Sequence, residues 1–239
     1  MTAPHPLDNP VRSSLAGPHA RFAERSGNVL RYPADVSPFL ALPDQPDADD
    51  WADVAALAGP GGLVALAGVR APAPDGWEVT VIGEGVQLVD HEVDVEVEAV
   101  ADGEAVRLGP DDVPEMLELA RRTKPGPFLP RTVELGTYLG LRRGGALVAM
   151  AGERLHPPGW TEISAVCTDD AWRGLGFASR LVRALVTGIR ARGETAFLHA
   201  VADNPAIGLY EALGFRLRRG TVFSAVRVPT DQPVTRTLR

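Results

Sequence analysis

Apolar residues recur with a helical period in three stretches of the chain. From Phe177 onward, leucine, valine and isoleucine return every three to four positions, which predicts a helix that buries one face against a sheet. The segments "DDVPEMLELARR" (residues 111–122) and "ADDWADVAALA" (48–58) have the same period, with aspartates suited to helix capping near their starts. Between residues 9 and 25 the period is loose and Gly17-Pro18 interrupts it, so we expect a short or broken helix there.

Short apolar or alternating runs predict strands between these helices. They are "NVLRY" (28–32), "GLVALAG" (62–68), "WEVTVIGEGVQLV" (77–89), "AVRL" (105–108), "TYLGLRR" (137–143), "ALVAMAGERL" (146–155), "WTEISAVCT" (160–168), "TAFLHAV" (195–201) and a last strand around 221–228. Gly144-Gly145 joins two of them in a predicted hairpin. The C-terminal half alternates strands with helices, which predicts an α/β (α+β) fold with a mixed sheet.

An acidic segment separates the two halves of the chain. Within residues 90–104, valines alternate with aspartate and glutamate, a pattern that fits either a half-exposed edge strand or a connector. We place a domain boundary near Gly103. Residues 1–102 are then expected to form an N-terminal α/β lobe, residues 103–229 a second domain, and residues 230–239 a loose tail.

Composition narrows the class of protein. The 239 residues are 45% hydrophobic, enough for a substantial core, and no run of 18 uncharged apolar residues predicts a membrane span. A net charge of −7 without a basic stripe argues against nucleic acid as a partner. The single cysteine, Cys167, rules out an intrachain disulfide, and five scattered histidines suggest no metal. We expect a cytoplasmic protein, monomeric or homodimeric, with no membrane partner.

The segment "RGLGFA" (173–178) places Gly174 and Gly176 directly before the predicted helix. The first amides of a helix have no partner within it, and the helix dipole favours an anion there, so the glycines can form a phosphate cradle. A plain strand-to-helix turn is the alternative. A P-loop would need Gly-Lys-Ser/Thr, where Phe177-Ala178-Ser179 stand, and a dinucleotide fingerprint would need glycine at Ser179.

A second segment, "NPAIGLYEALGF" (204–215), has the signals of a short, well-bounded helix. Asn204 can cap its start, proline follows at the first helical position, and Gly214 suits its end. Tyr210 lies within it. These signals alone leave two interpretations of Tyr210 open: a half-buried aromatic residue that packs in the helix, or a functional residue.

Together the two segments resemble the GNAT (GCN5-related N-acetyltransferase) superfamily, and residues 106–228 are similar to its FR47-like branch. The resemblance implies the GNAT fold, a mixed and mostly antiparallel central sheet flanked by helices, and a divergent GNAT-like N-terminal lobe without a coenzyme loop. It implies acetyl-CoA as cosubstrate and no metal. The implied coenzyme contacts are Arg173, Gly174, Leu175, Gly176, Phe177, Ala178 and Ser179 at the pyrophosphate, the main chain of Val166, Cys167 and Thr168, and Asn204 and Tyr210 near the thiol end.

Acyl transfer to an amine also needs a base and an acid. Strand alternation places Glu162, Ser164 and Val166 on one face and Ile163, Ala165 and Cys167 on the other. We expect Glu162 to take the ammonium proton through a water held by Ser164, and Tyr210 to protonate the departing thiolate. A solvated Glu162 at a strand end, and an acyl-enzyme on Cys167, are the alternatives, although no His or Asn stands at a spacing that would activate the thiol.

The sequence thus favours an N-acyltransferase that transfers acetyl from acetyl-CoA to a primary amine of a small molecule or amino acid, by direct attack in a ternary complex. A catalytically inactive acyl-CoA-binding regulatory protein is the main alternative, and a nucleotide-cofactor protein a more distant one. The acceptor is left open, because acceptor pockets are built from loops, here "TKPGPFLPRT" (123–132) and the N-terminal lobe.

Overall fold

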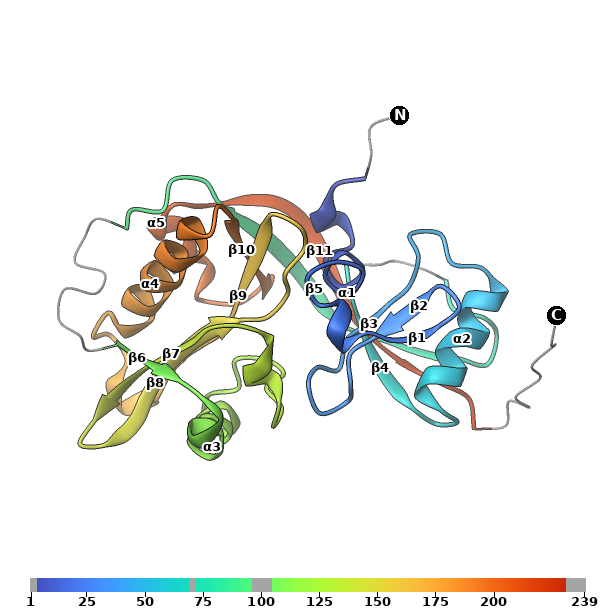
Figure 1. Ribbon diagram of the computed structural model, residues 1–239, viewed down its shortest axis with the longest axis horizontal. Helices are drawn as coiled ribbons and strands as arrows, with labels where there is room; N and C mark the ends of the chain where they lie inside the picture. The colour runs from blue at the N-terminus through green and yellow to red at the C-terminus, as the bar shows by residue number, and fades with distance from the viewer. Residues whose placement is uncertain (1–3, 69–71, 96–104, 231–239) are drawn as a thin grey trace.

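The computed structural model of the protein describes residues 4–68, 72–95 and 105–230 (Figure 1). The expected domain boundary near Gly103 and nearly all of the expected tail lie outside these ranges. No helix among the described residues is long and apolar enough to cross a membrane.

The described residues contain one large sheet of eight strands in the order β4-β11-β5-β10-β9-β8-β7-β6. Its strands are β4 (Leu63–Ala67), β5 (Glu78–Asp90), β6 (Ala105–Leu108), β7 (Tyr138–Arg143), β8 (Ala146–Glu153), β9 (Trp160–Thr168), β10 (Thr195–Val201) and β11 (Phe215–Arg227). Only β9 and β10 pair in parallel, and the other neighbouring strands of this sheet pair antiparallel. The prediction of a mixed, mostly antiparallel sheet is confirmed.

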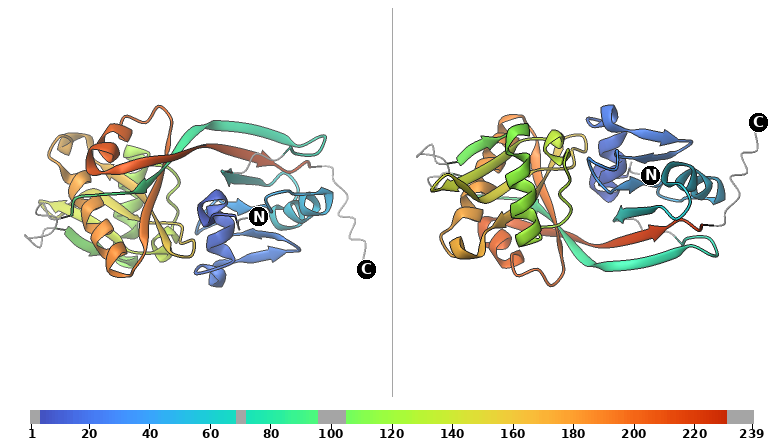
Figure 2. Two further views of the ribbon diagram at one scale, coloured as in Figure 1. Left: turned by 90° about the horizontal axis from the view of Figure 1, so that it is seen from above. Right: turned by 90° about the horizontal axis from the view of Figure 1, so that it is seen from below.

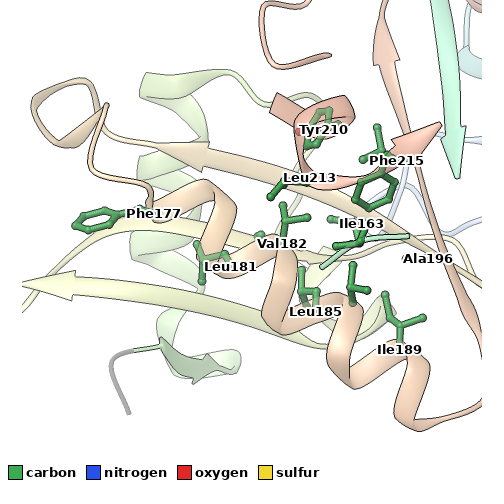
Figure 3. Packing of buried hydrophobic residues seen from close by; sticks show 14 of the residues in the cluster. Ile163, Phe177, Leu181, Val182, Leu185, Ile189, Ala196, Tyr210, Leu213 and Phe215 are labelled. Carbon is green, nitrogen blue, oxygen red and sulfur yellow. The ribbon is translucent and has the colours of Figure 1, made fainter. Parts of the chain in front are cut away.

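Two helices cover opposite faces of strands β6 to β10. Helix α4 (Phe177–Ala191) packs its apolar stripe, together with α5 (Ile207–Leu213), into one buried cluster that includes Ile163 of β9 (Figure 3). Helix α3 (Val113–Thr123) covers the other face (Figure 1) and contributes Met116 and Leu119 to a second cluster. The start predicted for α4 is confirmed, because its period of 3.6 residues turns one continuous apolar stripe toward the sheet.

Strands β5 and β11 connect the two lobes of the molecule. They run side by side along almost their whole length, from one lobe into the other (Figure 2). The second half of β5 also pairs with β10, and the second half of β11 also pairs with β4. Each lobe therefore receives strand segments from sequence on both sides of residue 103.

The N-terminal lobe contains the remaining elements. These are α1 (Pro10–Leu15), α2 (Ala48–Ala58) and a three-stranded sheet of β1 (Glu24–Ser26), β2 (Val29–Arg31) and β3 (Leu40–Ala41). Asp47 caps α2 by accepting a hydrogen bond from the amide of Asp50, so the predicted helix begins where its capping residue indicates. The expected break after α1 is confirmed, since a short 3₁₀ turn (Ala20–Phe22) follows it. Strands β1 and β3 were not predicted, and β11 begins six residues before its predicted start.

Candidate functional site

The loop before α4 has the geometry of an anion cradle. Gly174 and Gly176 have φ angles of 78° and 75°, which L side chains rarely adopt, and a Cβ added at either would project into open space. Within the described part of the chain, the amides of residues 174–179 donate no hydrogen bond. They stand at the positive end of a helix of 15 residues, so the loop can bind a phosphate group through its backbone.

Cationic and aromatic side chains surround this loop. The guanidinium of Arg180 lies 5.3 Å from the centroid of the Phe177 ring, and that of Arg143 lies 4.7 Å from it. Trp172 stacks on the same ring with the centroids 6.4 Å apart. Arg173 is exposed and pairs with Asp170 at 2.7 Å. These contacts pack the start of α4 against its surroundings.

The strand before the loop separates from its parallel neighbour. The ladder between β9 and β10 runs from the pair Trp160/Thr195 to the pair Ile163/Leu198 and ends there, although both strands continue. Residues 164–168 therefore have a main-chain edge that is not used by β10. Val166, Cys167 and Thr168, expected as main-chain contacts of the coenzyme, all lie in this segment.

A β-bulge lies at the point of separation. Ala165 has a φ angle of 54°, and the register between β8 and β9 shifts between Met150 and Gly152. The predicted alternation of faces is consequently wrong beyond Ser164: Ile163 and Val166 pack under α4, whereas Ala165 and Cys167 pack under α3. The extra residue of the bulge reverses the side on which the following side chains point.

Tyr210 lies on α5, buried and next to Phe215, with their ring centroids 6.2 Å apart (Figure 3). Burial raises the pKa of its hydroxyl to about 12, with the negative charge of a Cys167 thiolate as the second cause. Tyr210 is therefore a protonated phenol at neutral pH. Asn204 accepts a hydrogen bond from the amide of Ala206 at 2.9 Å, so it caps a turn that precedes α5, and the helix itself begins at Ile207.

Cys167 is buried, and burial raises the pKa of its thiol to about 11. A neutral thiol is a poor nucleophile, because the thiolate is the reactive form. The geometry of Cys167 therefore favours a main-chain role over an acyl-enzyme.

Glu162 lies at the centre of a buried ion pair. Its two carboxylate oxygens accept hydrogen bonds from Nε and Nη2 of Arg154 at 2.8 and 2.7 Å, and one of them also from Nδ1 of His199 at 2.7 Å. Burial alone would raise the pKa of Glu162, but the charge and hydrogen bonds of Arg154, assisted by His199, lower it to about 2. The carboxylate is fully buried, so it is neither a solvated strand-end group nor free to accept a proton from a substrate.

Gln87 determines which nitrogen of His199 carries the proton. Its side-chain oxygen accepts from Arg218 at 2.8 Å, and its NH₂ group lies 3.0 Å from both the Leu7 carbonyl and Nε2 of His199. Because arginine only donates and a carbonyl only accepts, Gln87 must donate to His199. Nε2 of His199 therefore accepts from Gln87 and Nδ1 donates to Glu162, so both ring nitrogens of this buried histidine have partners.

Sequence reasoning missed the partners of Glu162, and the role expected for Ser164 stays a prediction. Ser164 is half-buried, precedes the bulge, and pairs with Gly152 on β8. Arg154 lies eight residues before Glu162, in the connection that follows β8, where its amide bonds the Glu162 carbonyl at 2.9 Å. The antiparallel turn between β8 and β9 was the available signal, since it brings these two positions opposite one another.

Comparison with known proteins identifies the family to which the chain belongs. The family described as FR47-like protein matches residues 138–224, from β7 to β11. A crystal structure of a GNAT-family protein from Novosphingobium aromaticivorans DSM 12444 is 39% identical, covers 93% of this chain and 98% of its own, and superposes with a TM-score of 0.83. The chain belongs to the GNAT family.

Two further relatives are more distant or shorter matches. The GCN5-related N-acetyltransferase from Kribbella flavida shares the fold, with a TM-score of 0.59 at 17% identity over 92% of this chain and 94% of its own. N-alpha-acetyltransferase RimI from Mycobacterium tuberculosis (strain ATCC 25618 / H37Rv) is 40% identical over 83 residues, 33% of this chain. That match spans about half, 51%, of the curated relative's length.

Proposed function

We propose that this GNAT protein is an acetyl-CoA-dependent N-acetyltransferase that acts on a primary amine of a small molecule or amino acid. One observation carries the proposal. The part of β9 that has separated from β10 leads along the chain into the loop whose amides, at the start of α4, have no hydrogen-bond partner in the part of the chain that the structure describes. An anion site and an open strand edge, connected in this order, suit the two ends of one long ligand. Residues 103–229 would supply the acyl-CoA site, with the N-terminal lobe as its companion.

The pyrophosphate of the coenzyme would lie at the loop. Backbone amides of residues 174–179 would donate to its oxygens, with Arg173 contributing charge and Gly174 and Gly176 leaving room for close approach. Asn204 would lie near the pantetheine arm. The described residues contain no cluster of His, Cys, Asp and Glu suited to a metal ion, and the proposed chemistry uses none.

The thioester would lie along the open edge of β9. A main-chain amide of Val166, Cys167 or Thr168 would donate to the carbonyl oxygen, where negative charge develops as the amine attacks. The carbon–nitrogen bond forms, the carbon–sulfur bond breaks, and its electron pair leaves with sulfur. Tyr210 would give the thiolate its phenolic proton, and the amine's proton would pass to water.

Glu162 is not proposed as the base, because both of its oxygens are engaged by Arg154 and His199. Ser164 remains the candidate for holding the acceptor or the water that receives its proton, since it lies next to the bulge and is only half-buried. Direct attack is favoured over an acyl-enzyme because Cys167 is a buried, neutral thiol.

The proposal is tested by incubating the protein with acetyl-CoA and a panel of amines, and following free thiol and product mass. The panel should hold polyamines, amino acids, aminoglycosides and a peptide with a free N-terminus, since a curated relative is named for N-alpha acetylation. We expect turnover of at least one amine, and a kcat lowered about 10²-fold or more by Tyr210→Phe. Tyr32→Phe, a buried tyrosine in the N-terminal lobe, is the matched control and should keep its kcat.

Two other outcomes are informative. Coenzyme A should raise the unfolding free energy by about 2.7 kcal/mol at about 100 times its Kd. Binding without turnover of any amine would support the acyl-CoA-binding regulatory protein instead. Absence of binding would contradict both readings.

A further inference from the structure

Three buried side-chain polar atoms have no hydrogen-bond partner among the described residues: Nε1 of Trp77, Nε2 of His156 and the hydroxyl of Tyr138. Of these, only the Tyr138 hydroxyl belongs to a residue on the strands that carry the candidate site. Tyr138 is 1% exposed. Because a buried hydroxyl without a partner costs stability, its presence calls for an explanation beyond packing, which phenylalanine would serve as well.

Tyr138 shares a cross-strand row with Ser164. Tyr138 on β7 pairs with Gly152 on β8, and Gly152 pairs with Ser164 on β9. Directly paired residues point to the same face of a sheet, so all three face α3. A Cβ added at Gly152 would collide with Cδ1, Cε1 and Cγ of the Tyr138 ring. The ring therefore lies across β8, in the space left by the missing side chain.

The other end of this row is the site of acyl transfer proposed above. Ser164 is directly followed by the bulge at Ala165, where β9 has just separated from β10. Glu162 and Arg154 lie beside this row, and both carboxylate oxygens of Glu162 are engaged by Arg154 and His199. They supply a fixed polar surface beside the row. Within the row itself Gly152 has no side chain, so the polar side chains are those of Tyr138 and Ser164, and the Tyr138 hydroxyl has no partner among the described residues.

The loop between α3 and β7 covers Tyr138, and the N-terminal lobe holds this loop in place. The ring of Phe128 meets the Tyr138 ring edge-on, with the centroids 5.6 Å apart. Three residues further along, the amide of Arg131 donates to the Asp35 carbonyl at 3.0 Å, and the Thr132 hydroxyl donates to the Val36 carbonyl at 2.7 Å. Burial raises the pKa of the Tyr138 hydroxyl, so it stays neutral and can both donate and accept.

We propose that Tyr138 is a positioning residue for the acceptor, whose hydroxyl accepts a hydrogen bond from the attacking amino group, directly or through one water. This inference rests on the proposed acyl transfer and assigns that reaction a further residue. The hydrogen bond would hold the nitrogen beside Ser164, with its lone pair toward the thioester at the bulge.

A comparison of two tyrosines tests the state of the hydroxyl without any substrate. Tyr138→Phe should melt at the same temperature as the natural protein or higher, because it removes an unpaired polar group. Tyr32→Phe is the control, since the Tyr32 hydroxyl bonds Nδ1 of His19 at 2.9 Å, and its Tm should fall. A fall in Tm for Tyr138→Phe as large as for Tyr32→Phe would overturn the inference, because it would reveal a structural partner.

Steady-state kinetics tests the role in positioning. With the amine that the panel identifies, Tyr138→Phe should raise the acceptor KM by about tenfold, because losing one hydrogen bond weakens binding by about that factor. The affinity for coenzyme A should stay unchanged. If the natural protein is active and the acceptor KM is unchanged in Tyr138→Phe, the role of Tyr138 is contradicted and the proposed function is not. If the natural protein acetylates no amine, both the proposed function and the role of Tyr138 are contradicted.

Discussion

The guanidinium of Arg154 holds both carboxylate oxygens of Glu162 in the core, at 2.8 and 2.7 Å. The pair is almost wholly shielded from solvent. A buried charge without its partner is far more costly than the intact pair. The relationship makes Glu162 a structural anion under the site of acyl transfer and not an exposed base.

Replacing this carboxylate should destabilise the fold. Glu162→Gln leaves the Arg154 charge buried and unpaired, so we expect the unfolding free energy to fall by about 3–5 kcal/mol. Urea unfolding at neutral pH measures the change. Glu118→Gln removes one partner of an exposed pair with Arg121 and should leave the midpoint almost unchanged. Equal midpoints for the natural protein and Glu162→Gln would contradict the account.

Stability should also depend on pH through His19. Burial, aided by the charge of a protonated His156, lowers the pKa of His19 from 6.5 to about 3. Between these values the unfolded chain binds a proton that the folded protein does not, so acid favours unfolding. This group should make the unfolding free energy fall by about 1.4 kcal/mol for each pH unit in that window. His19→Gln should flatten the dependence, and parallel curves for both proteins would refute the assignment.

The glycine loop should be sensitive to a single methyl group. Gly174 and Gly144 both have positive φ angles, 78° and 57°, and both have open space where a Cβ would stand. Alanine at either position should therefore cost a similar 1–2 kcal/mol, as an order of magnitude. Only Gly174→Ala would project into the anion cradle, so only this variant should weaken coenzyme A binding, by about tenfold or more. Calorimetric titration of both variants measures the difference.

The acid proposed for the thiolate should stay protonated over the working range of pH. Burial raises the pKa of Tyr210 to about 12, well above the ordinary value of about 10. The pH profile of kcat should therefore show no loss from tyrosine ionisation up to about pH 10. A basic limb near pH 9 that disappears in Tyr210→Phe would show that the phenol ionises earlier than its burial implies.

Local signals in the sequence predicted the helices better than they predicted the site. Helix α2 begins after Asp47 because capping is a short-range hydrogen bond, and α4 follows its own apolar period. The bulge in β9 has no comparable signal, since Ala165 rather than glycine takes the positive φ. The partners of Glu162 and the row from Tyr138 to Ser164 depend on strand register, which residue type alone does not determine.

The placement of the coenzyme is the central claim, and a crystal structure with coenzyme A tests it most directly. We expect the pyrophosphate oxygens to accept hydrogen bonds from amides of residues 174–179, and the sulfur to lie between β9 and β10, beside Val166, Cys167 and Thr168 and facing Tyr210. A coenzyme bound elsewhere, with the loop amides still facing solvent, would contradict the account.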